Sequence, residues 1–278
     1  MWNGLPIVIK RKINQREGHG LKSSIKFTHG FDIKNIRDFE VGDSPRLVNR
    51  SHLAKFGEPI IIEKYPDRNA VVAMLVDVSR SEKLGSEQTK LEAKIDLLRW
   101  FSSACISKGH RVIIVTFTDR IEFESPLIKS CNLLEEAVRE SIERIPVGKL
   151  TDPGDAINYA HELATRQNYP VDLVCVLSDF LFPREYTEEL GSLYDASDVI
   201  VFIVRDKIEL QIPPIAGGMT MRDSETGEIF CVASMEQGIL PAYLKRIGID
   251  ICLFNTKDSE EECFDNLQDF FTLRMEEK

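Results

Sequence analysis

Short apolar runs alternate with longer helical patterns from about residue 69 to the end of the chain. The apolar runs are rich in Val and Ile and cover residues 71–77, 111–117, 171–179, 197–204 and 249–254. Continuous apolar runs of about four to eight residues favour strands that are buried on both faces, as in a parallel sheet covered by helices. We therefore expect these five runs to form one buried sheet.

The segments between these runs have apolar positions at helical spacing. Helices are predicted over residues 89–109, 132–145, 154–167 and 259–275. For the third, Thr151 or Asp152 is the expected N-cap, with Pro153 in the first turn, where its missing donor is harmless. The alternation predicts a three-layer, Rossmann-like α/β fold, with helices on both faces of a mostly parallel sheet.

Two parts of the chain lack this alternation of strand and helix patterns. Residues 1–68 carry short strand-like runs and turn signals, and residues 208–232 resemble a hairpin insertion punctuated by Pro-Pro and Gly-Gly pairs. We expect an N-terminal β-rich segment (1–68) and an α/β domain (69–278). The insertion should pack with the N-terminal segment as a β-rich appendage.

Charge and composition narrow the function classes. The chain has a net charge of −10 and a pI near 5.2, which argues against a nucleic-acid partner and against attraction to anionic membranes. No apolar run approaches the roughly 20 residues that span a bilayer, and the patch at residues 5–9 is shorter than a signal-peptide core. We expect a cytoplasmic protein without direct membrane insertion, and reduced cysteines, because the six are scattered without a C-x-x-C pair.

Polar residues follow the predicted strands at three places. Residues 71–77 end in Asp77, followed at alternate positions by Ser79 and Ser81, while Thr151 precedes a helix and Asp179 ends a later strand. If the strands carrying Asp77 and Asp179 are neighbours, all five side chains meet at one edge of the sheet. Two carboxylates and three hydroxyls would suit a hard divalent cation, Mg²⁺ above all, with Mn²⁺ or Ca²⁺ as alternatives. The other interpretation is that these residues only form turns and helix caps.

These motifs resemble a von Willebrand factor A-like domain. D-x-S-x-S after a buried strand, the Thr of the TDPGDAI segment and the later S-D match the metal-ion-dependent adhesion site of that domain, and all five residues occur in the family's order. The resemblance implies that Ser79, Ser81 and Thr151 contact the metal. Asp77 and Asp179 would act largely through water, and an acidic residue of a partner would complete the shell.

The flanking segments resemble a bacterial family catalogued as domain of unknown function 58. The resemblance rests on IRDFEVGDSPRLVNRSHLAKFGEPIIIEKY (36–65) and RDKIELQIPPIAGGMTMRDSETGEI (205–229), and it covers the chain from about Gly18 to the last helix. Members of that family resemble accessory proteins of MoxR-type AAA+ ATPases. The resemblance therefore implies that the partner is such an ATPase or its client protein.

Three charged residues beside the motif are candidates for partner contact. Arg80 is expected to turn outward to solvent or to an acidic partner, although it could instead repel a cation. Asp152 and Asp155 are interpreted first as helix-start acids, with a direct metal role as the alternative. Arg80 and Lys149 are the only cations that the sequence suggests near the site.

Three functions fit these observations. The first is a non-enzymatic module that binds an acidic residue of a partner through Mg²⁺. The second is an enzyme for metal-assisted phosphoryl hydrolysis with Asp77 as acceptor, which is disfavoured because the D-x-S loop lacks the second aspartate of a D-x-D phosphatase loop. The third is a scaffold with a vestigial metal site that binds partners through the β appendage. We expect no catalytic residues.

Overall fold

The computed structural model describes most of the α/β region and parts of the flanking segments. The described residues are 2–11, 25–27, 33–39, 48–64, 69–79, 89–148, 151–166, 169–180, 185–206, 219–222, 229–232 and 242–276.

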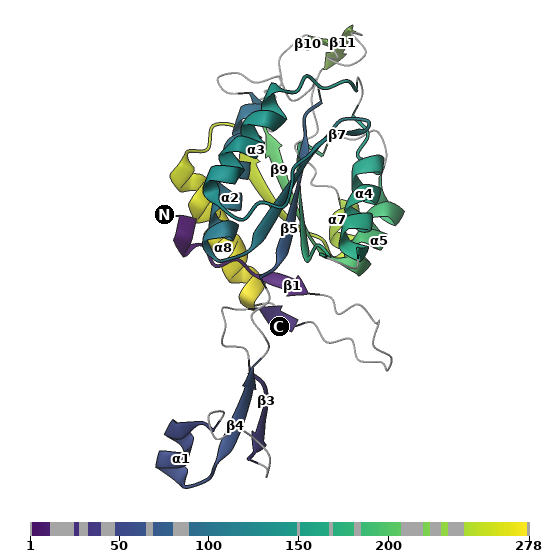
Figure 1. The fold of residues 1–278 in the computed structure, drawn as a ribbon. Coiled ribbons are helices and arrows are strands. Elements are labelled where there is room, and N and C mark those ends of the chain that lie inside the picture. The colour runs from purple at the N-terminus through teal and green to yellow at the C-terminus, as the bar shows by residue number, and fades with distance from the viewer. Residues whose placement is uncertain are drawn as a thin grey trace.

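A six-stranded sheet forms the centre of the molecule (Figure 1). Its strands are β5 (Val71–Asp77), β6 (Arg111–Phe117), β7 (Ile121–Glu124), β8 (Leu173–Ser178), β9 (Asp198–Arg205) and β12 (Asp250–Asn255). Their order is β12-β9-β8-β5-β6-β7, and every pair is parallel except β6 with β7. The five predicted strands are confirmed, while the antiparallel edge strand β7 was not predicted.

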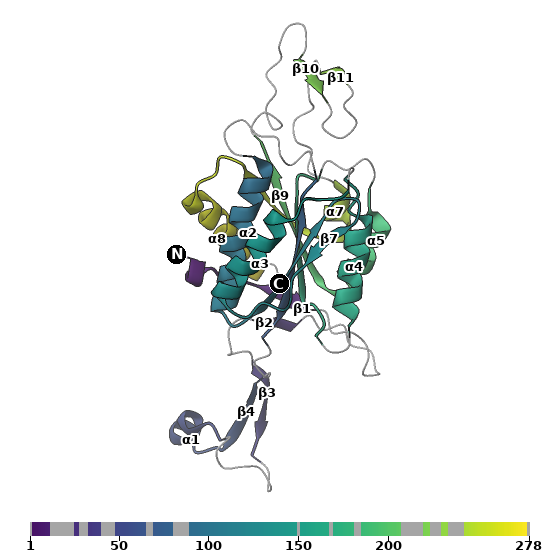
Figure 2. The same ribbon diagram turned by 45° about the horizontal axis from the view of Figure 1, so that its top comes forward.

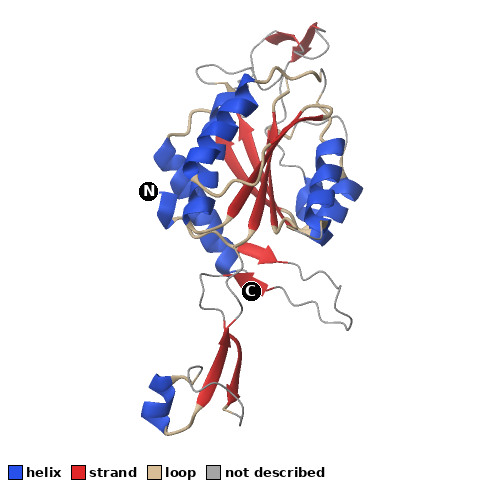
Figure 3. Cartoon of the chain, viewed as in Figure 1, coloured by secondary structure: helices blue, strands red, loops and turns tan. Residues whose placement is uncertain are grey.

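Helices cover both faces of this sheet (Figure 3). One face carries α2 (Lys90–Ser107), α3 (Cys131–Glu143) and α8 (Glu260–Glu276), and the other carries α4 (Gly154–Thr165), α5 (Thr187–Ala196) and α7 (Ala242–Ile247). Alternate side chains of β5 enter the two cores, with Met74 on the α2 side and Leu75 on the α4 side. The predicted three-layer α/β fold is confirmed; α5 and α7 are additional helices.

The start of α4 differs in detail from the prediction. Its N-cap residue is Pro153, which makes no side-chain cap, and not Thr151 or Asp152. Asp152 nevertheless caps from one residue earlier, because its Oδ1 accepts a hydrogen bond from the Gly154 backbone N–H at 2.8 Å. The acid therefore satisfies one of the helix's free donors, as such side chains do at helix starts.

In the described parts of the N-terminal segment, two strand pairs and one α-helix follow the short helix η1 (Trp2–Gly4). β1 (Ile9–Arg11) pairs with β2 (Ile25–Phe27), β3 (Ile33–Asp38) pairs with β4 (Ile60–Lys64), and α1 (Arg50–Phe56) lies between β3 and β4 in the sequence. Helix α1 was not expected. It is defined by its caps, because the Asn49 side chain accepts from the His52 N–H, and Gly57 closes the helix in the left-handed conformation.

The described part of the 208–232 insertion is a small hairpin. β10 (Met219–Arg222) pairs with β11 (Ile229–Val232), and both figures place it at the opposite end of the central sheet from β3 and β4 (Figures 1 and 2). The described strands of the two segments are therefore not in contact. The expected packing of the insertion on residues 1–68 stays a prediction, since much of both segments lies outside the described residues.

The first residues of the chain are held against the α/β core. Trp2, in the short helix η1 (Trp2–Gly4), stacks on Trp100 at 5.6 Å between ring centroids, and its Nε1 donates to Glu260 at 2.8 Å. Among the described helices, none combines the length and the apolar character needed to cross a bilayer.

Candidate metal centre

The predicted site lies at the point where the strand order of the sheet reverses. β5 pairs with β6 on one side and with β8 on the other, both in parallel. In open α/β sheets this switch point is where the loops after neighbouring strands separate and leave a crevice for ligands. Asp77 ends β5 and Asp179 directly follows β8, so the expectation that their strands are neighbours is confirmed.

The Asp77 carboxylate is fully buried and held from two sides. Its Oδ1 accepts a hydrogen bond from the Ser79 backbone N–H at 2.9 Å, and its Oδ2 accepts one from the Ser178 hydroxyl at 2.9 Å. The first bond has the pattern of an Asx turn directly after β5. Ser178 belongs to the neighbouring strand β8, so it fixes the carboxylate across the switch point.

Asp179 is fixed through both its side chain and its backbone. Its Oδ2 lies 2.6 Å from the Lys90 ammonium nitrogen, and its carbonyl oxygen accepts from the Arg205 Nε at 3.0 Å. The next residue, Phe180, has a φ of 55° although it is not glycine. A bulky residue in this region carries backbone strain of about 1–3 kcal/mol, which the burial of the Phe180 ring in the core offsets. The turn that presents Asp179 is thus tightly determined.

Thr151 reaches the same edge through a segment attached to β6 and β7. The backbone N–H of Asp152 donates to the Thr118 carbonyl at 3.2 Å, just beyond the end of β6. Glu122 of β7 accepts from the Val147 N–H at 3.0 Å and from the Gly148 N–H at 2.7 Å. These bonds attach Val147 and Gly148 to β7 and Asp152 to the end of β6, the neighbour of β5.

The pKa of Glu122 reflects this role. Burial raises the pKa, but the Thr118 hydroxyl and the Val147 and Gly148 N–H groups outweigh burial, and the net pKa lies below its usual value. The carboxylate therefore binds the segment in its ionised form.

The remaining predicted residues are placed as follows. Asp152 is exposed, and its Oδ1 also accepts from the Tyr186 hydroxyl at 3.0 Å; Asp155 is exposed in the first turn of α4. These positions agree with their interpretation as helix-start acids. Ser81 and Arg80 lie outside the described residues, so their part in the site stays a prediction.

Two lysines of α2 contact Asp77 and Asp179, although neither was predicted to lie at the site. Lys90 is 1% exposed and bonds to Asp179, and Lys94 is 0% exposed and donates to the Asp77 carbonyl oxygen at 2.5 Å. The expectation that Arg80 and Lys149 are the only nearby cations is therefore wrong. A signal was present, because Lys90 and Lys94 continue the buried stripe formed by Leu98, Phe101 and Cys105 on one side of α2.

The candidate site has enough oxygen ligands for a hard cation only if the Ser and Thr hydroxyl groups bind it together with the two carboxylates. Within the described ranges, no three His, Cys, Asp or Glu side chains gather as they would in a conventional metal site. Asp77, Ser79 and Asp179 are buried oxygen donors at one edge, and Thr151 is half-buried next to Asp152, which bonds to Thr118 just beyond the end of β6. An all-oxygen set of this kind suits Mg²⁺.

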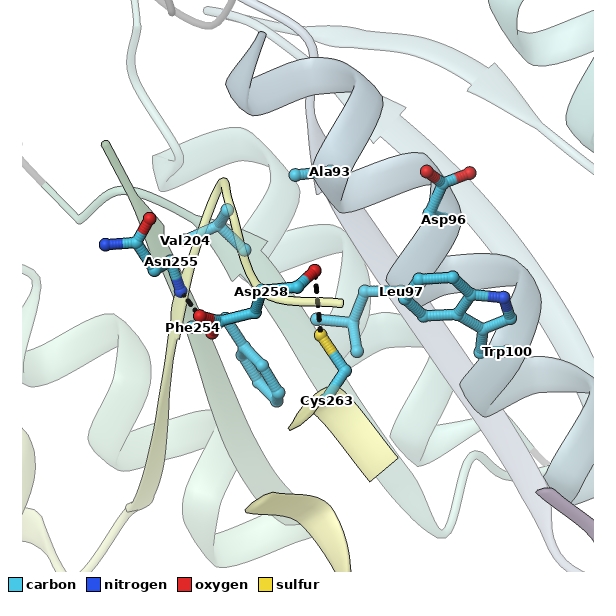
Figure 4. A pocket seen from close by; sticks show the side chains of 9 residues that line it. All are labelled: Ala93, Asp96, Leu97, Trp100, Val204, Phe254, Asn255, Asp258 and Cys263. Carbon is cyan, nitrogen blue, oxygen red and sulfur yellow. Dashed lines mark hydrogen bonds between the residues drawn. The ribbon is translucent and has the colours of Figure 1, made fainter. Parts of the chain in front are cut away.

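The cavity drawn in Figure 4 is a separate feature. It has a volume of about 20 Å³ and lies between α2, the ends of β9 and β12, and the start of α8, with Asp96, Asp258 and Cys263 among its walls. That volume holds about one water molecule. Burial raises the pKa of Cys263 to about 12, which disfavours the thiolate form that reacts and binds metals. The cavity is no substrate pocket.

Comparison with known proteins identifies the family. The model of the protein family of unknown function DUF58 matches residues 35–247. The chain belongs to the DUF58 family. No curated protein matches this DUF58 chain at a significant level.

Solved structures resemble this DUF58 protein in fold. The conserved hypothetical protein BatB from Bacteroides thetaiotaomicron is 14% identical, with a TM-score of 0.50 over 74% of this chain and 100% of BatB. An aerotolerance-related membrane protein from Bacteroides fragilis is 17% identical, with a TM-score of 0.49 over 73% of this chain and 100% of its own. A von Willebrand factor type A structure from Catenulispora acidiphila is 13% identical, with a TM-score of 0.45 over 73% of this chain and 42% of its own. At these identities the BatB likeness concerns the fold alone.

Proposed function

We propose that this DUF58 protein is a non-enzymatic interaction module that binds an acidic side chain of a partner through a divalent cation. The observation that carries the proposal is the position of Asp77 and Asp179 at the ends of paired strands at the switch point. Ser79 is buried beside them, and the Thr151 segment is attached to the next strand. Asp77, Ser79, Ser81, Thr151 and Asp179 would hold Mg²⁺, or Mn²⁺ or Ca²⁺ in its place. When bound, the cation would supply an open coordination position for a carboxylate oxygen.

The residues of the chain prepare this site in a defined way. Ser178 and the Ser79 N–H orient the Asp77 carboxylate, while Arg205 and the strained Phe180 turn orient Asp179. Ser178 and Arg205 belong to sheet strands, so these two supports fix the positions of Asp77 and Asp179 before a cation binds. Arg80 and the exposed Asp152 and Asp155 stand as candidate contacts for the partner around it.

The partner is proposed from the family resemblance. A MoxR-type AAA+ ATPase, or a client protein that it acts on, is the partner class we propose for this chain in the cytoplasm. The protein would act as an adaptor, and its affinity for the partner would depend on the cation. A chelator should then release the partner.

Direct metal binding is the first test. Mn²⁺ and Mg²⁺ are titrated into the purified chain, with Mn²⁺ followed by electron paramagnetic resonance and Mg²⁺ by calorimetry. We expect one site per chain, lost in Asp77→Asn and in Ser79→Ala. The exposed Asp195→Asn in α5 is the matched control and should bind as the wild type does. Equal binding in Asp77→Asn and wild type would contradict the proposed site.

Partner capture is the second test. The tagged chain is incubated with lysate of its own cell in Mg²⁺ or in chelator, alongside a Ser79→Ala/Ser81→Ala variant. We expect an AAA+ ATPase to co-purify only with Mg²⁺ and intact serines. The same partners in all lanes would support the scaffold alternative, in which the β appendage makes the contacts, and substitutions within 31–65 or 208–232 would then abolish capture.

A second candidate is metal-dependent hydrolysis of a phosphate ester, and the buried lysines are the observation that favours it. Lys90 and Lys94 provide cations close to two carboxylates, as phosphoryl transfer requires. Each lysine is already engaged, Lys90 with the Asp179 carboxylate and Lys94 with a backbone carbonyl, so we place this function second. Phosphate release from p-nitrophenyl phosphate in Mg²⁺ that disappears in Asp77→Asn would reverse the ranking.

A further inference from the structure

Lys90 stands at an unfavourable position for a cation. It is the first residue of α2, directly after the N-cap Thr89, and it is 1% exposed. The N-terminus of a helix carries partial positive charge, which disfavours a lysine there, and burial of an ammonium group is costly unless it is paired. A residue that breaks two local rules at a candidate site indicates a functional constraint.

Asp179 compensates for both penalties. The ammonium nitrogen of Lys90 lies 2.6 Å from Asp179 Oδ2, and the side chains of the two residues are 2% and 6% exposed. This oxygen belongs to a carboxylate that the candidate metal centre needs. The protein therefore already holds a positive charge against a proposed metal ligand.

Two more buried cations surround the same strand ends. Lys94 donates to the carbonyl oxygen of Asp77, and Arg205 donates to the carbonyl oxygen of Asp179. Lys94 and Arg205 thus bind backbone oxygens in these contacts, and they add positive potential close to the site. The positive charges of Lys90, Lys94 and Arg205 therefore lie close to the Asp77 and Asp179 residues, where the low dielectric constant strengthens their repulsion of an added divalent cation.

We propose that Lys90 is a built-in competitor of the divalent cation, so that metal binding requires its ammonium group to release the Asp179 carboxylate. The inference rests on the proposed function and names its regulation. The cation binds weakly to the chain alone, and a carboxylate brought by a partner adds the negative charge that tips the balance. Metal and acidic partner then bind cooperatively, which is a coupling between two ligands of one site.

Mn²⁺ and Mg²⁺ titrations of four variants of the 278-residue chain test this inference. Lys90→Met removes the competing charge and keeps an unbranched side chain, and Lys90→Arg keeps the charge. Lys108→Met removes the same unit of charge at the other end of α2 and is the matched control. Lys90→Gln keeps a hydrogen-bond donor for Asp179 without the charge, and it replaces Lys90→Met if circular dichroism shows that the methionine variant does not fold.

We expect Lys90→Met to bind Mn²⁺ at least about tenfold more tightly than the wild type, and Lys90→Gln to lie between them. Lys90→Arg and Lys108→Met should bind as the wild type does. Unchanged or weaker binding by Lys90→Met would overturn the inference and leave the metal-binding function intact. Binding by Lys90→Met without detectable binding by the isolated wild type would support the role of Lys90, because the natural chain then needs the carboxylate of a partner to hold the cation. Absence of binding in both would refute both.

Discussion

Glu122 and Gly148 hold the candidate site together from the side of β7. The Glu122 carboxylate accepts the Gly148 N–H at 2.7 Å, and the same oxygen accepts the Thr118 hydroxyl at 2.6 Å. Thr118 in turn binds the Asp152 N–H through its carbonyl. The position of Thr151, which lies between these contacts in the sequence, therefore depends on a carboxylate that the metal motif does not include.

This contact should depend on pH. The pKa of Glu122 lies below its usual value of 4.5 in the folded chain. A lowered folded pKa contributes stability that is present above the unfolded pKa and lost as the pH falls through the folded pKa. We expect the free energy of unfolding to be higher for the wild type than for Glu122→Gln at pH 7, with the difference shrinking as the pH falls below 4.5.

Urea denaturation of both chains between pH 3 and pH 7 measures this difference. The exposed Glu140→Gln in α3 is the control for loss of a surface carboxylate. A gap between wild type and Glu122→Gln that stays constant across the range would show that the ionised carboxylate is not what binds the segment.

Gly148 cannot carry a side chain without moving the segment. A Cβ atom at this position would lie 1.9 Å from Thr118 Oγ1 and 2.8 Å from Thr118 Cβ, and these atoms lie close to the backbone and cannot yield easily. We expect Gly148→Ala to lose stability by about 1–3 kcal/mol, as overpacked sites do. Mn²⁺ affinity should fall as well, because Thr151 is displaced.

Gly191→Ala is the matched control for Gly148→Ala. Gly191 lies within α5, where a Cβ would meet nothing within 4 Å. The alanine should there stabilise the chain by up to about 1 kcal/mol through helix propensity. Thermal melting and Mn²⁺ titration of both variants check the pair, and intact metal binding in Gly148→Ala would separate Thr151 from the site.

The Lys90–Asp179 pair should have opposite effects on stability and on metal affinity. Without metal, Lys90→Met removes the ammonium group that pairs with the buried Asp179 carboxylate. This loss should lower the free energy of unfolding by about 3–5 kcal/mol. We expect the melting temperature in chelator to fall by several degrees and to recover more strongly with Mg²⁺ than that of the wild type. Lys108→Met should melt close to the wild type in both buffers. A stability loss that Mg²⁺ does not reduce would indicate a purely structural ion pair.

The sequence predicted an element well where burial alone determines which residue types the element contains. β5 and β6 were predicted to the residue, because strands buried on both faces form continuous apolar runs. β7 has four residues, of which Phe123 alone is buried, so no periodicity could reveal it. Both carboxylates of the site were predictable because strand ends share an edge once the order of the strands is assumed.

The contacts that hold the site residues in place were harder to predict from the sequence. Arg205 and Asp179 are 26 positions apart, and their contact depends on the pairing of β8 with β9. In the sequence, Lys90 looks like an ordinary polar residue at the start of a helix. Its burial depends on how α2 packs on the sheet. Long-range contacts of charged side chains therefore required the structure, whereas the stripe shared with Leu98 and Phe101 was the one local indication.

Arg274 connects the first residues of the chain to the α/β core. Its guanidinium group donates to Asp198 Oδ1 at 2.8 Å, to Asp250 Oδ2 at 2.6 Å and to the Val8 carbonyl at 2.9 Å. The Lys10 N–H adds a bond to Asp198 Oδ2 at 2.7 Å. Removal of the guanidinium leaves Asp198, which is 2% exposed, without its cation, and we expect Arg274→Met to lose about 3–5 kcal/mol at pH 7.

The loss should shrink as the pH falls. Burial raises the pKa of Asp198 above its usual 3.8, against the opposing effect of Arg274. Without Arg274 the folded pKa rises further, and a carboxyl group with a raised folded pKa destabilises the fold progressively as the pH increases through that range. Urea denaturation at pH 4 and pH 7 measures the change. Arg246→Met, which removes only the exposed pair with Glu185, is the control and should cost about 0–1 kcal/mol at either pH. An equal loss for Arg274→Met at both pH values would show that its packing, and not its charge, holds the first residues of the chain in place.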